Sequence, residues 1–365
     1  MENGDMKTFI VDVLKELSEA HGVAGSERTV RSVFCQHVSG EFVGDRLGGG
    51  FVRREGSENA PKILVCGHFD EVGFAVQSFT SEGFIRFSAL GGVWPHVVPG
   101  NRVRILTDSG KEVVGVIGAK PPHFLSDEER GKLLSLEQMF IDVGARDRED
   151  VSQRLGIRLG DTIVFDSPFA NLTNSELLVG KAFDNRVGVA LAVAAARNLG
   201  DGNHPNTVFC GATVQEEVGG RGAAAVARLL DPDVVIVLEG TPADDMPGSA
   251  PDTRQGALGK GVQIRLQDPS AIMNRPLVDF IRHVAEEEGI DHQLAVRRSG
   301  GTDAKYFQAH GLGVPTAVLG VPVRYPHTAN GVVDAEDCVK SLDLLLAVLN
   351  RLDSNVAQSF VPCSA

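Results

Sequence analysis

The sequence has few aromatic residues, few cysteines and no surplus of positive charge. One Trp and two Tyr among 365 residues make an aromatic-lined sugar cleft difficult to build. The 35 basic and 48 acidic residues give a formal net charge of -13, which disfavours a nucleic-acid partner because nothing is left over to neutralise phosphates. The five cysteines include no Cys-x-x-Cys pair, so we expect reduced, mostly buried thiols in a cytoplasmic protein. These are Cys35, Cys66, Cys210, Cys338 and Cys363.

Long apolar runs are also absent. No run reaches the length of about 18 residues that a membrane-spanning helix requires, so we expect no membrane partner. The N-terminal residues lack the basic region and apolar core of a signal peptide. Hydrophobic residues make up 42% of the chain and charged residues 23%, the composition of an ordinary globular protein. The length predicts two domains, or one domain with an insertion.

Most of the chain alternates between strand and helix patterns. Apolar residues at positions 10, 13, 14 and 17 have helical spacing, and a second helix is expected from about Ser26. Apolar runs at 63–66, 207–214, 234–238 and 316–321 predict buried strands. Helices are expected at 187–199, from the glycine-rich segment 219–222 to Leu230, at 277–288 and from Asp334 to Leu352. This alternation predicts an α/β fold in which a mixed sheet is sandwiched by helices.

The pattern changes between about residues 71 and 166. Two alternating segments, 102–106 and 113–117, flank the turn signal Asp108-Ser109-Gly110, as in a β-hairpin. A polar stretch at 127–139 is expected to be helical, and Trp94 is expected to pack inside this region. We therefore predict an inserted, mostly β domain at 71–166 within a domain made of residues 1–70 and 167–365.

Side chains of metal-ligand type fall at the ends of the predicted strands and at the start of one helix. In open α/β sheets, sites form at the carboxyl ends of strands. Two imidazoles with several carboxylates suit catalytic Zn²⁺, Co²⁺ or Mn²⁺, and a pair of ions needs one bridging carboxylate with two further ligands each. Each residue taken singly has an ordinary explanation, such as a solvated acid or a helix N-cap. Their common placement favours a dinuclear site, and the residues are His68, Asp184, Glu216, Glu217, Glu239 and His327.

The chain resembles the M42 family of metallo-aminopeptidases, and this resemblance covers nearly the whole sequence. The segments that carry it are Gly67–Phe74, Gly180–Arg186, Thr213–Gly222, Gly300–Ala304 and Arg324–His327. The resemblance implies a zinc-peptidase-like fold whose β insertion makes dimer contacts. It implies removal of N-terminal residues from short peptides, and a homo-oligomer in which dimers assemble into a dodecamer.

The resemblance also implies a role for each residue. Asp184 would bridge two ions, with His68 and Glu239 completing one site and Glu217 and His327 the other. Glu216 would be the general base and then the general acid. Asp70 would orient the imidazole of His68. Two readings stay open for Gly301, Thr302 and Asp303: they line the substrate pocket, or they form a glycine turn that caps the next helix.

The sequence departs from the family pattern at two places, the first of which concerns specificity and the second the shape of a loop. Glu239 stands where the family usually has Asp, and Thr328-Ala329 follows His327 where Ser-Pro is usual. The preferred N-terminal residue and the physiological ion therefore stay open. So does a non-peptide amidase or deacylase acting at the same site. An endoglucanase-type glycosidase is disfavoured, because adjacent Glu216 and Glu217 would point in different directions on a strand. A non-catalytic scaffold would not need Glu216.

Overall fold

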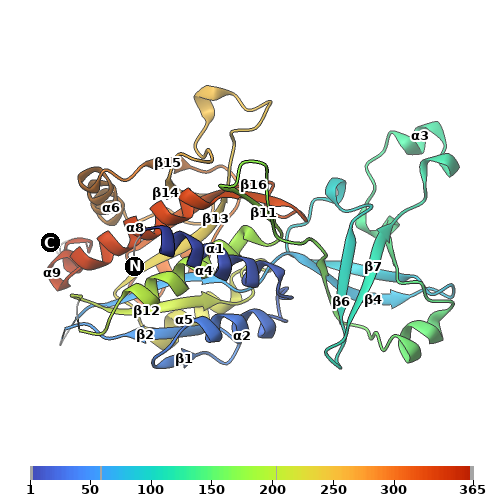
Figure 1. Cartoon of the computed structure of the whole chain (residues 1–365), viewed down its shortest axis with the longest axis horizontal. Coiled ribbons are helices and arrows are strands. Elements are labelled where there is room, and N and C mark those ends of the chain that lie inside the picture. Colours follow the sequence, from blue (N-terminus) through green and yellow to red (C-terminus); the bar gives the residue numbers. More distant parts are fainter. Residues whose placement is uncertain (1–2, 58–59, 203, 362–365) are drawn as a thin grey trace.

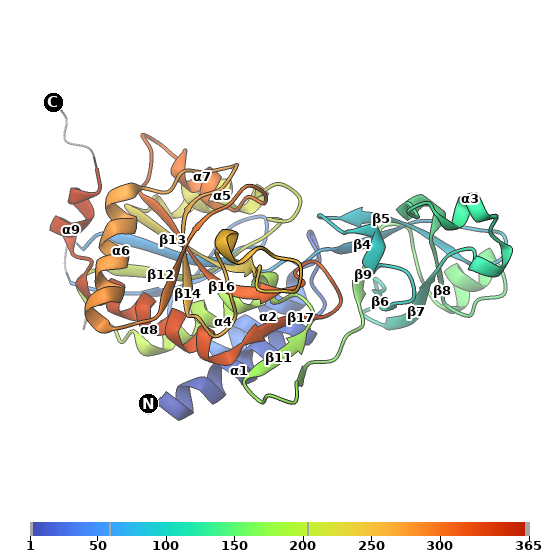
Figure 2. The ribbon, with the colours of Figure 1, turned by 90° about the horizontal axis from the view of Figure 1, so that it is seen from above.

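The computed structural model describes residues 3–57, 60–202 and 204–361, and it has two parts (Figure 1). A large α/β body contains both ends of the described chain, and a smaller antiparallel β-barrel projects from one side of it. The chain enters the barrel after strand β3 and returns to the body after β9, as the view from above shows (Figure 2). This arrangement is the predicted one, a mixed sheet in an α/β body with an inserted β domain.

The body is built on an 11-stranded mixed sheet. Its central strands β12, β3, β13 and β16 are parallel neighbours and are buried on both faces, as parallel strands require. These four are Thr207–Thr213, Lys62–His68, Val234–Pro242 and Thr316–Arg324. The outer strands are β1 Phe42–Gly44, β2 Gly50–Arg54, β10 Ala170–Asn171, β11 Leu177–Gly180, β14 Val262–Gln267, β15 His292–Val296 and β17 Gly331–Asp334.

Helices cover both faces of this sheet (Figure 2). Helix α4, Phe183–Asn198, lies across the central strands beneath α1 and α8, and it is buried on all sides from Val187 to Ala196. A helix that is apolar all round is stable only when surrounded, which explains its run of Ala and Val. The other helices are α1 Asn3–Glu19, α2 Arg28–His37, α5 Arg221–Leu230, α6 Arg275–Glu288, α7 Ala304–Gln308, α8 Ala335–Arg351 and α9 Ser354–Ser359.

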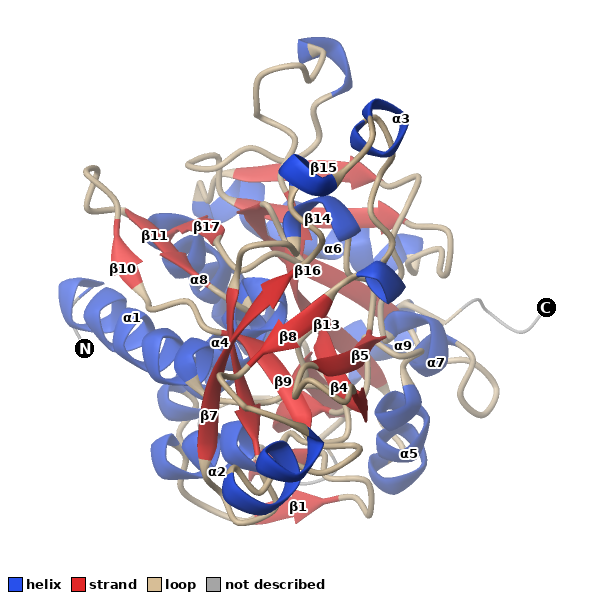
Figure 3. Ribbon diagram, turned by 90° about the vertical axis from the view of Figure 1, so that its right-hand side faces the viewer, coloured by secondary structure: helices blue, strands red, loops and turns tan. Residues whose placement is uncertain are grey.

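The barrel closes in the order β4-β5-β8-β7-β6-β9 and has its own core around Phe74, Ile105, Ile141 and Phe165. Figure 3 shows its strands in front of the body. The strands are β4 Gly73–Phe79, β5 Ile85–Leu90, β6 Arg102–Leu106, β7 Glu112–Gly118, β8 Phe140–Asp142 and β9 Thr162–Phe165. All lie inside the predicted insertion; its limits at 71 and 166 stay a prediction.

Two local predictions were wrong. The polar stretch 127–139 forms only the single turn α3, Asp127–Arg130, and a 3₁₀ turn at Leu136–Gln138. Neither turn has a fully buried side chain, and only Leu136 packs partly against the barrel core, which is too little to extend the helix beyond Gly131. Trp94 is 59% exposed and does not pack inside the barrel.

The thiols follow the prediction where they are described. Cys66, Cys210 and Cys338 are buried, Cys35 is exposed, and all four are free. Cys363 lies outside the described residues. In the described part of the chain, no helix combines the length and apolarity needed to cross a membrane.

Candidate metal centre

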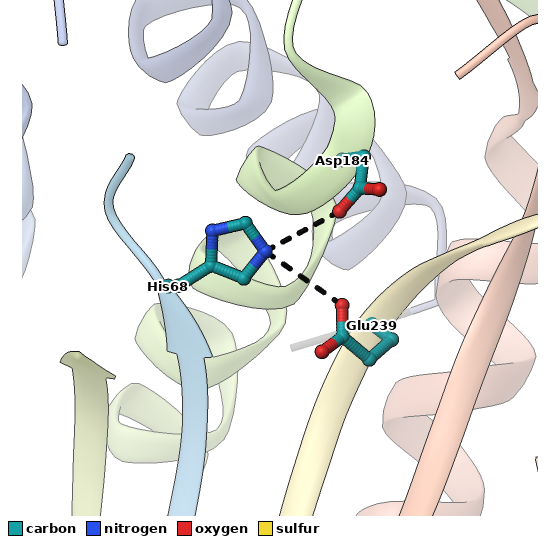
Figure 4. A group of neighbouring side chains, drawn as sticks. All are labelled: His68, Asp184 and Glu239. Atoms are coloured by element: carbon teal, nitrogen blue, oxygen red, sulfur yellow. Dashed lines mark ion pairs between the residues drawn. The ribbon is translucent and has the colours of Figure 1, made fainter. Parts of the chain in front are cut away.

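The residues of ligand type converge at one edge of the central sheet. The strand β3 ends at His68, and β13 carries Glu239 near its carboxyl end. Since β3, β12, β13 and β16 run parallel, the segments that follow them meet at the same edge. Figure 4 shows His68, Asp184 and Glu239 pointing toward one another from a strand, the start of α4 and a second strand. The turn after β12 brings Glu216 and Glu217, and the turn after β16 brings His327.

The carboxylate of Asp184 lies between the two imidazoles. Its Oδ1 is 3.3 Å from Nε2 of His68, and its Oδ2 is 3.3 Å from Nε2 of His327. Glu239 Oε2 lies 3.8 Å from the first imidazole nitrogen, and Glu217 Oε1 lies 3.3 Å from the second. The ligand atoms thus form two groups of three, each within 4.8 Å of one another, and Asp184 belongs to both.

Backbone carbonyls orient both imidazoles. Nδ1 of His68 lies 3.0 Å from the carbonyl oxygen of Asp70, and Nδ1 of His327 lies 2.8 Å from that of Gly92. A carbonyl only accepts hydrogen bonds, so each Nδ1 donates, and this directs each Nε2 towards the shared carboxylate. Gly92 follows β5, so the inserted domain holds one of the two histidines.

The side chain of Asp70 positions the turn after β12. Its Oδ1 accepts a hydrogen bond from the backbone N–H of Glu216, and its Oδ2 accepts one from that of Glu217, both at 3.0 Å. Its contact with His68 Nδ1 is longer, at 3.4 Å. Gln215, with φ of 59°, turns the chain off the strand just before these two acids. The strand ends at Thr213, so the two glutamates belong to a turn and not to the strand end.

The centre concentrates negative charge away from water. Burial, followed by repulsion from Asp184, raises the pKa of Glu217 to about 8. Burial likewise raises the pKa of Glu239. For Asp184, burial opposes ionisation, but hydrogen bonds to His327 and His68 lower its pKa overall. Burial lowers the pKa of His327, but Asp184 and Glu217 outweigh this and raise it to about 10.

This charge distribution fits divalent cations. Four carboxylates share the site with two imidazoles, and bound cations would compensate the excess of negative charge. Glu217 Oε1 is buried and has no hydrogen-bond partner among the described residues, although His327 Nε2 is close. An unpaired buried carboxylate oxygen beside an oriented imidazole nitrogen is what a metal site of this kind needs.

Glu216 lies beside His68 of the first ligand group but belongs to neither group. Its Oε2 is 4.0 Å from His68 Nε2, the side chain is only 16% exposed, and burial raises its pKa. Asn185 was not identified from the sequence, although it lies in the motif around Asp184. Its side-chain amide donates to Glu239 Oε2 at 3.0 Å and to the carbonyl of Leu238 at 2.7 Å. It therefore fixes the orientation of the Glu239 carboxylate.

The three residues of the Gly-Gly-Thr-Asp segment separate in the structure. Gly301 and Thr302 line a cavity of about 610 Å³ that also contains the metal-centre side chains. Asp303 is 2% exposed and lies behind the wall, where its carboxylate accepts a hydrogen bond from the hydroxyl of Thr213. Burial raises the pKa of Asp303 to about 7. Trp94 lines the same cavity.

A comparison with protein families identifies the chain's relatives. The sequence model described as M42 glutamyl aminopeptidase matches residues 48–344. The chain belongs to the M42 peptidase family. This M42 peptidase is 32% identical to the glutamyl aminopeptidase of Lactococcus lactis subsp. cremoris, an alignment that covers 94% of this chain and 97% of that one. It is also 32% identical to the lysyl aminopeptidase of Pyrococcus furiosus, over 93% and 97% of the two chains.

Solved structures show the same fold. A TET aminopeptidase from a marine sediment archaeon of the Thaumarchaeota superposes on this M42 peptidase with a TM-score of 0.91 and 38% identity, over 96% of this chain and 99% of that one. The TET1 peptidase of Pyrococcus horikoshii, described as assembling into a tetrahedron or a large octahedral shell, gives 0.84 and 30%, over 94% and 100%. These findings confirm the resemblance, the fold class and the assignment to the aminopeptidase class of hydrolases.

Proposed function

We propose that this M42 peptidase removes N-terminal residues from short peptides and that its metal centre holds two divalent ions. The observation that carries the proposal is the Asp184 carboxylate, whose two oxygens face different imidazoles at equal distance. In the proposed site, His68 and Glu239 complete the ligands of one ion, and Glu217 and His327 those of the other. When bound, such ions lower the pKa of a water molecule and polarise the scissile carbonyl.

The chain's own residues supply the proton transfers. Glu216 takes a proton from the attacking water and returns it to the leaving amine. Its position outside both ligand groups leaves its carboxylate free for this work. Asp70 holds the backbone of Glu216 in place. Gly301 and Thr302 would line the channel in which the peptide lies.

The test is hydrolysis of an amino-acyl anilide panel. Wild-type protein should lose activity in excess chelator and regain it on addition of Zn²⁺, Co²⁺ or Mn²⁺, which shows which of these ions support hydrolysis. Glu216→Gln should bind the same number of ions as the wild type but lose hydrolysis. If Glu216→Gln cleaves anilides as fast as the wild type, the assignment of the base is wrong. The matched control is Glu336→Gln, an exposed acid on α8 that does not line the cavity.

Two rival activities give other outcomes. An amidase or deacylase would release acyl groups from N-acylated amines while leaving amino-acyl anilides intact. A glycosidase would cleave cellulose oligomers even after exhaustive chelation, because its two carboxylates need no metal ion.

We also propose a homo-oligomer in which dimers assemble into a dodecamer, located in the cytoplasm. Support for assembly comes from the barrel, where Val114, Val116 and Phe124 expose apolar surface, and from the assemblies described for the P. horikoshii relative. Support for the compartment comes from the free thiols of the described residues. Light scattering of the purified protein tests the assembly: a monomer at micromolar concentration would refute it.

A further inference from the structure

Trp94 stands at the boundary between two cavities. It lines the cavity of about 610 Å³ that contains the metal-centre side chains, and it also lines a second cavity of about 360 Å³. Pro326 lines both cavities as well. Trp94 belongs to the inserted barrel domain and Pro326 to the turn after β16, so the boundary is formed by segments that are distant in the sequence. Trp94 and Pro326 together are called the apolar rim below.

The apolar rim lies beside the metal centre. Gly92, whose carbonyl oxygen accepts a hydrogen bond from Nδ1 of His327, precedes Trp94 by two positions. Pro326 directly precedes His327 in the chain. An extended peptide advances roughly 3.3 Å per residue. The rim is therefore within reach of the residue that follows a scissile bond at the metal centre.

The segment around Trp94 is held in place by the chain itself. Trp94 precedes Pro95, which restricts the backbone of Trp94 to extended conformations, and its φ and ψ are -83° and 117°. Its carbonyl oxygen accepts a hydrogen bond from the backbone N–H of Val97 at 3.1 Å, and the side-chain amide of Asn101 donates to the carbonyl of Val97 at 2.5 Å. The ring of His96 lies edge-on to the indole, with 4.6 Å between the ring centres. The indole is thus positioned although it is 59% exposed.

The turn that carries Pro326 has an unusual backbone conformation. Tyr325 and His327, on either side of it, have φ values of 55° and 58°, in the left-handed region that residues other than glycine seldom adopt. The hydroxyl of Thr328 donates to the carbonyl of Tyr325 at 2.8 Å and stabilises the turn. The same turn brings His327 to Asp184 and places Pro326 on the cavity wall. It therefore positions a proposed ligand and a rim residue together.

The second cavity differs from the first in charge. Four acidic and three basic side chains line the first cavity. Among the described residues that line the second, there is no Asp, Glu, Lys or Arg. Val97, Ala329 and the exposed Tyr325 add apolar surface to that of the rim. Such a surface favours an apolar side chain and disfavours a charged one, which would lose water without gaining a partner.

The rim also lies on an open side of the first cavity. The N-terminal residue is the end of a substrate chain, whereas the rest of the peptide has to leave the metal centre along an open path. Arg265 and Thr302 are buried and belong to a closed part of the cavity. Trp94 and Tyr325 are exposed, and beyond the rim the second cavity continues the path. The leaving part of the peptide would therefore pass over Trp94.

We propose that the apolar rim binds the side chain of the substrate's second residue, the one that follows the scissile bond. This M42 peptidase then prefers peptides with an aromatic or large aliphatic residue at that position. The inference rests on the aminopeptidase function proposed above. It concerns the leaving side of the bond, so it is separate from any preference for the N-terminal residue itself.

The experiment compares kcat/KM for two tripeptides that share their first and third residues and carry Phe or Gly at the second position. The first residue is the one whose anilide is hydrolysed fastest. The wild type should favour the Phe peptide by about ten-fold, the size expected when an aromatic side chain is buried against another ring. Trp94→Ala should bring the ratio close to one, and Trp94→Phe should keep most of it. The matched control is Leu159→Ala, an exposed apolar residue of the inserted domain that lines neither cavity.

A second peptide series tests which side of the bond the rim serves. It keeps Gly at the second position and varies the first residue. If Trp94→Ala changes the ranking of these peptides but not the ratio between Phe and Gly at the second position, the rim binds the N-terminal side chain and the proposal is wrong. A wild-type ratio near one would also overturn it. Because Trp94 is exposed, Trp94→Ala should keep the wild-type Tm, so a changed ratio does not come from unfolding.

A third measurement needs no hydrolysis. Trp94 is the chain's only tryptophan, so intrinsic tryptophan fluorescence reports on the rim alone. Phenethylamine has an aromatic ring and an amine but no amide bond to cleave, and it should shift the emission in a saturable way, whereas ethylamine should not. An unchanged emission with phenethylamine would refute the rim as a binding site. A saturable shift without hydrolysis of any peptide in Zn²⁺, Co²⁺ or Mn²⁺ would reject the aminopeptidase function while supporting the rim.

Discussion

The Asp70 carboxylate holds the backbone of Glu216, although 146 positions separate the two residues in the chain. One oxygen accepts the N–H of Glu216, and the other accepts the N–H of Glu217. Asp70, two positions after His68, therefore also positions the proposed base Glu216 and the proposed ligand Glu217. This links the end of β3 to the turn after β12, and so couples the two halves of the site.

Asp70→Asn should impair this coupling, because an amide offers one acceptor oxygen where the carboxylate offers two. We expect ion affinity or kcat/KM to fall roughly ten- to hundred-fold, the effect typical of residues that orient metal ligands. Competition with a chelator and anilide kinetics measure the two quantities separately. Asp127→Asn, in the exposed turn α3, is the control. Unchanged values for both quantities in Asp70→Asn would show that the turn holds its shape without this carboxylate.

Asn185→Ala should weaken binding at the ion site that contains Glu239. The variant removes the amide that holds the Glu239 carboxylate and leaves a buried carbonyl, that of Leu238, without its donor. We expect metal analysis after dialysis to show loss of up to one ion per chain, and stability to fall by about 1–3 kcal/mol. Asn198→Ala at the exposed end of the same helix is the control. Full occupancy after dialysis would contradict the positioning role.

His21 should make the protein less stable in acid. It lies between the body and the barrel, where its Nε2 is 2.9 Å from the hydroxyl of Thr162, and it is buried. Burial lowers the pKa of His21 from 6.5 to about 4 in spite of the attraction of Glu71. As the pH falls, the unfolded chain therefore binds this proton at a higher pH than the folded chain does. The contribution of His21 to the free energy of unfolding is fully present above pH 6.5 and is lost as the pH drops towards 4, by up to roughly 3 kcal/mol.

Urea unfolding between pH 4 and pH 7 measures this effect. His21→Gln cannot gain the charge, so its stability should depend less steeply on pH than that of the wild type. His283→Gln, an exposed histidine on α6, should keep the wild-type slope. Equal slopes for wild type and His21→Gln would exclude His21 as the source of acid sensitivity.

Glu71→Gln should destabilise the fold strongly. Glu71 is the shared partner of two buried cations, with Lys181 Nζ at 2.7 Å and Arg186 Nη2 at 2.9 Å from its Oε1. Removing its charge leaves both cations buried without an anion, which costs about 3 kcal/mol or more. Urea unfolding at neutral pH measures the loss. Glu336→Gln, which removes an exposed partner of Lys7, should cost less than about 1 kcal/mol.

The sequence by itself determined the architecture and the set of candidate ligands. Buried strands and helices carry local periodic signals, and ligand-type residues at strand ends converge because parallel strands end at one edge of a sheet. The prediction of a long helix at 127–139 was wrong because this polar segment has no apolar face to bury, and without such a face a helix of this length is not stabilised by packing. Trp94 was misplaced because the sequence does not show whether a loop side chain faces the core or a cavity.

Only the tertiary structure decided how the site is held and what lines it. Gly92 orients His327 across 235 positions of sequence, and Asp70 reaches Glu216 across 146. Such contacts leave no local pattern, because a backbone carbonyl or N–H is present at almost every residue. For the same reason Asp303 lies behind the cavity wall, while Arg265 on β14 and Arg297, which follows β15, both line the cavity. Which side chains line a cavity depends on how the fold brings distant segments together, and neither net charge nor any single motif indicates it.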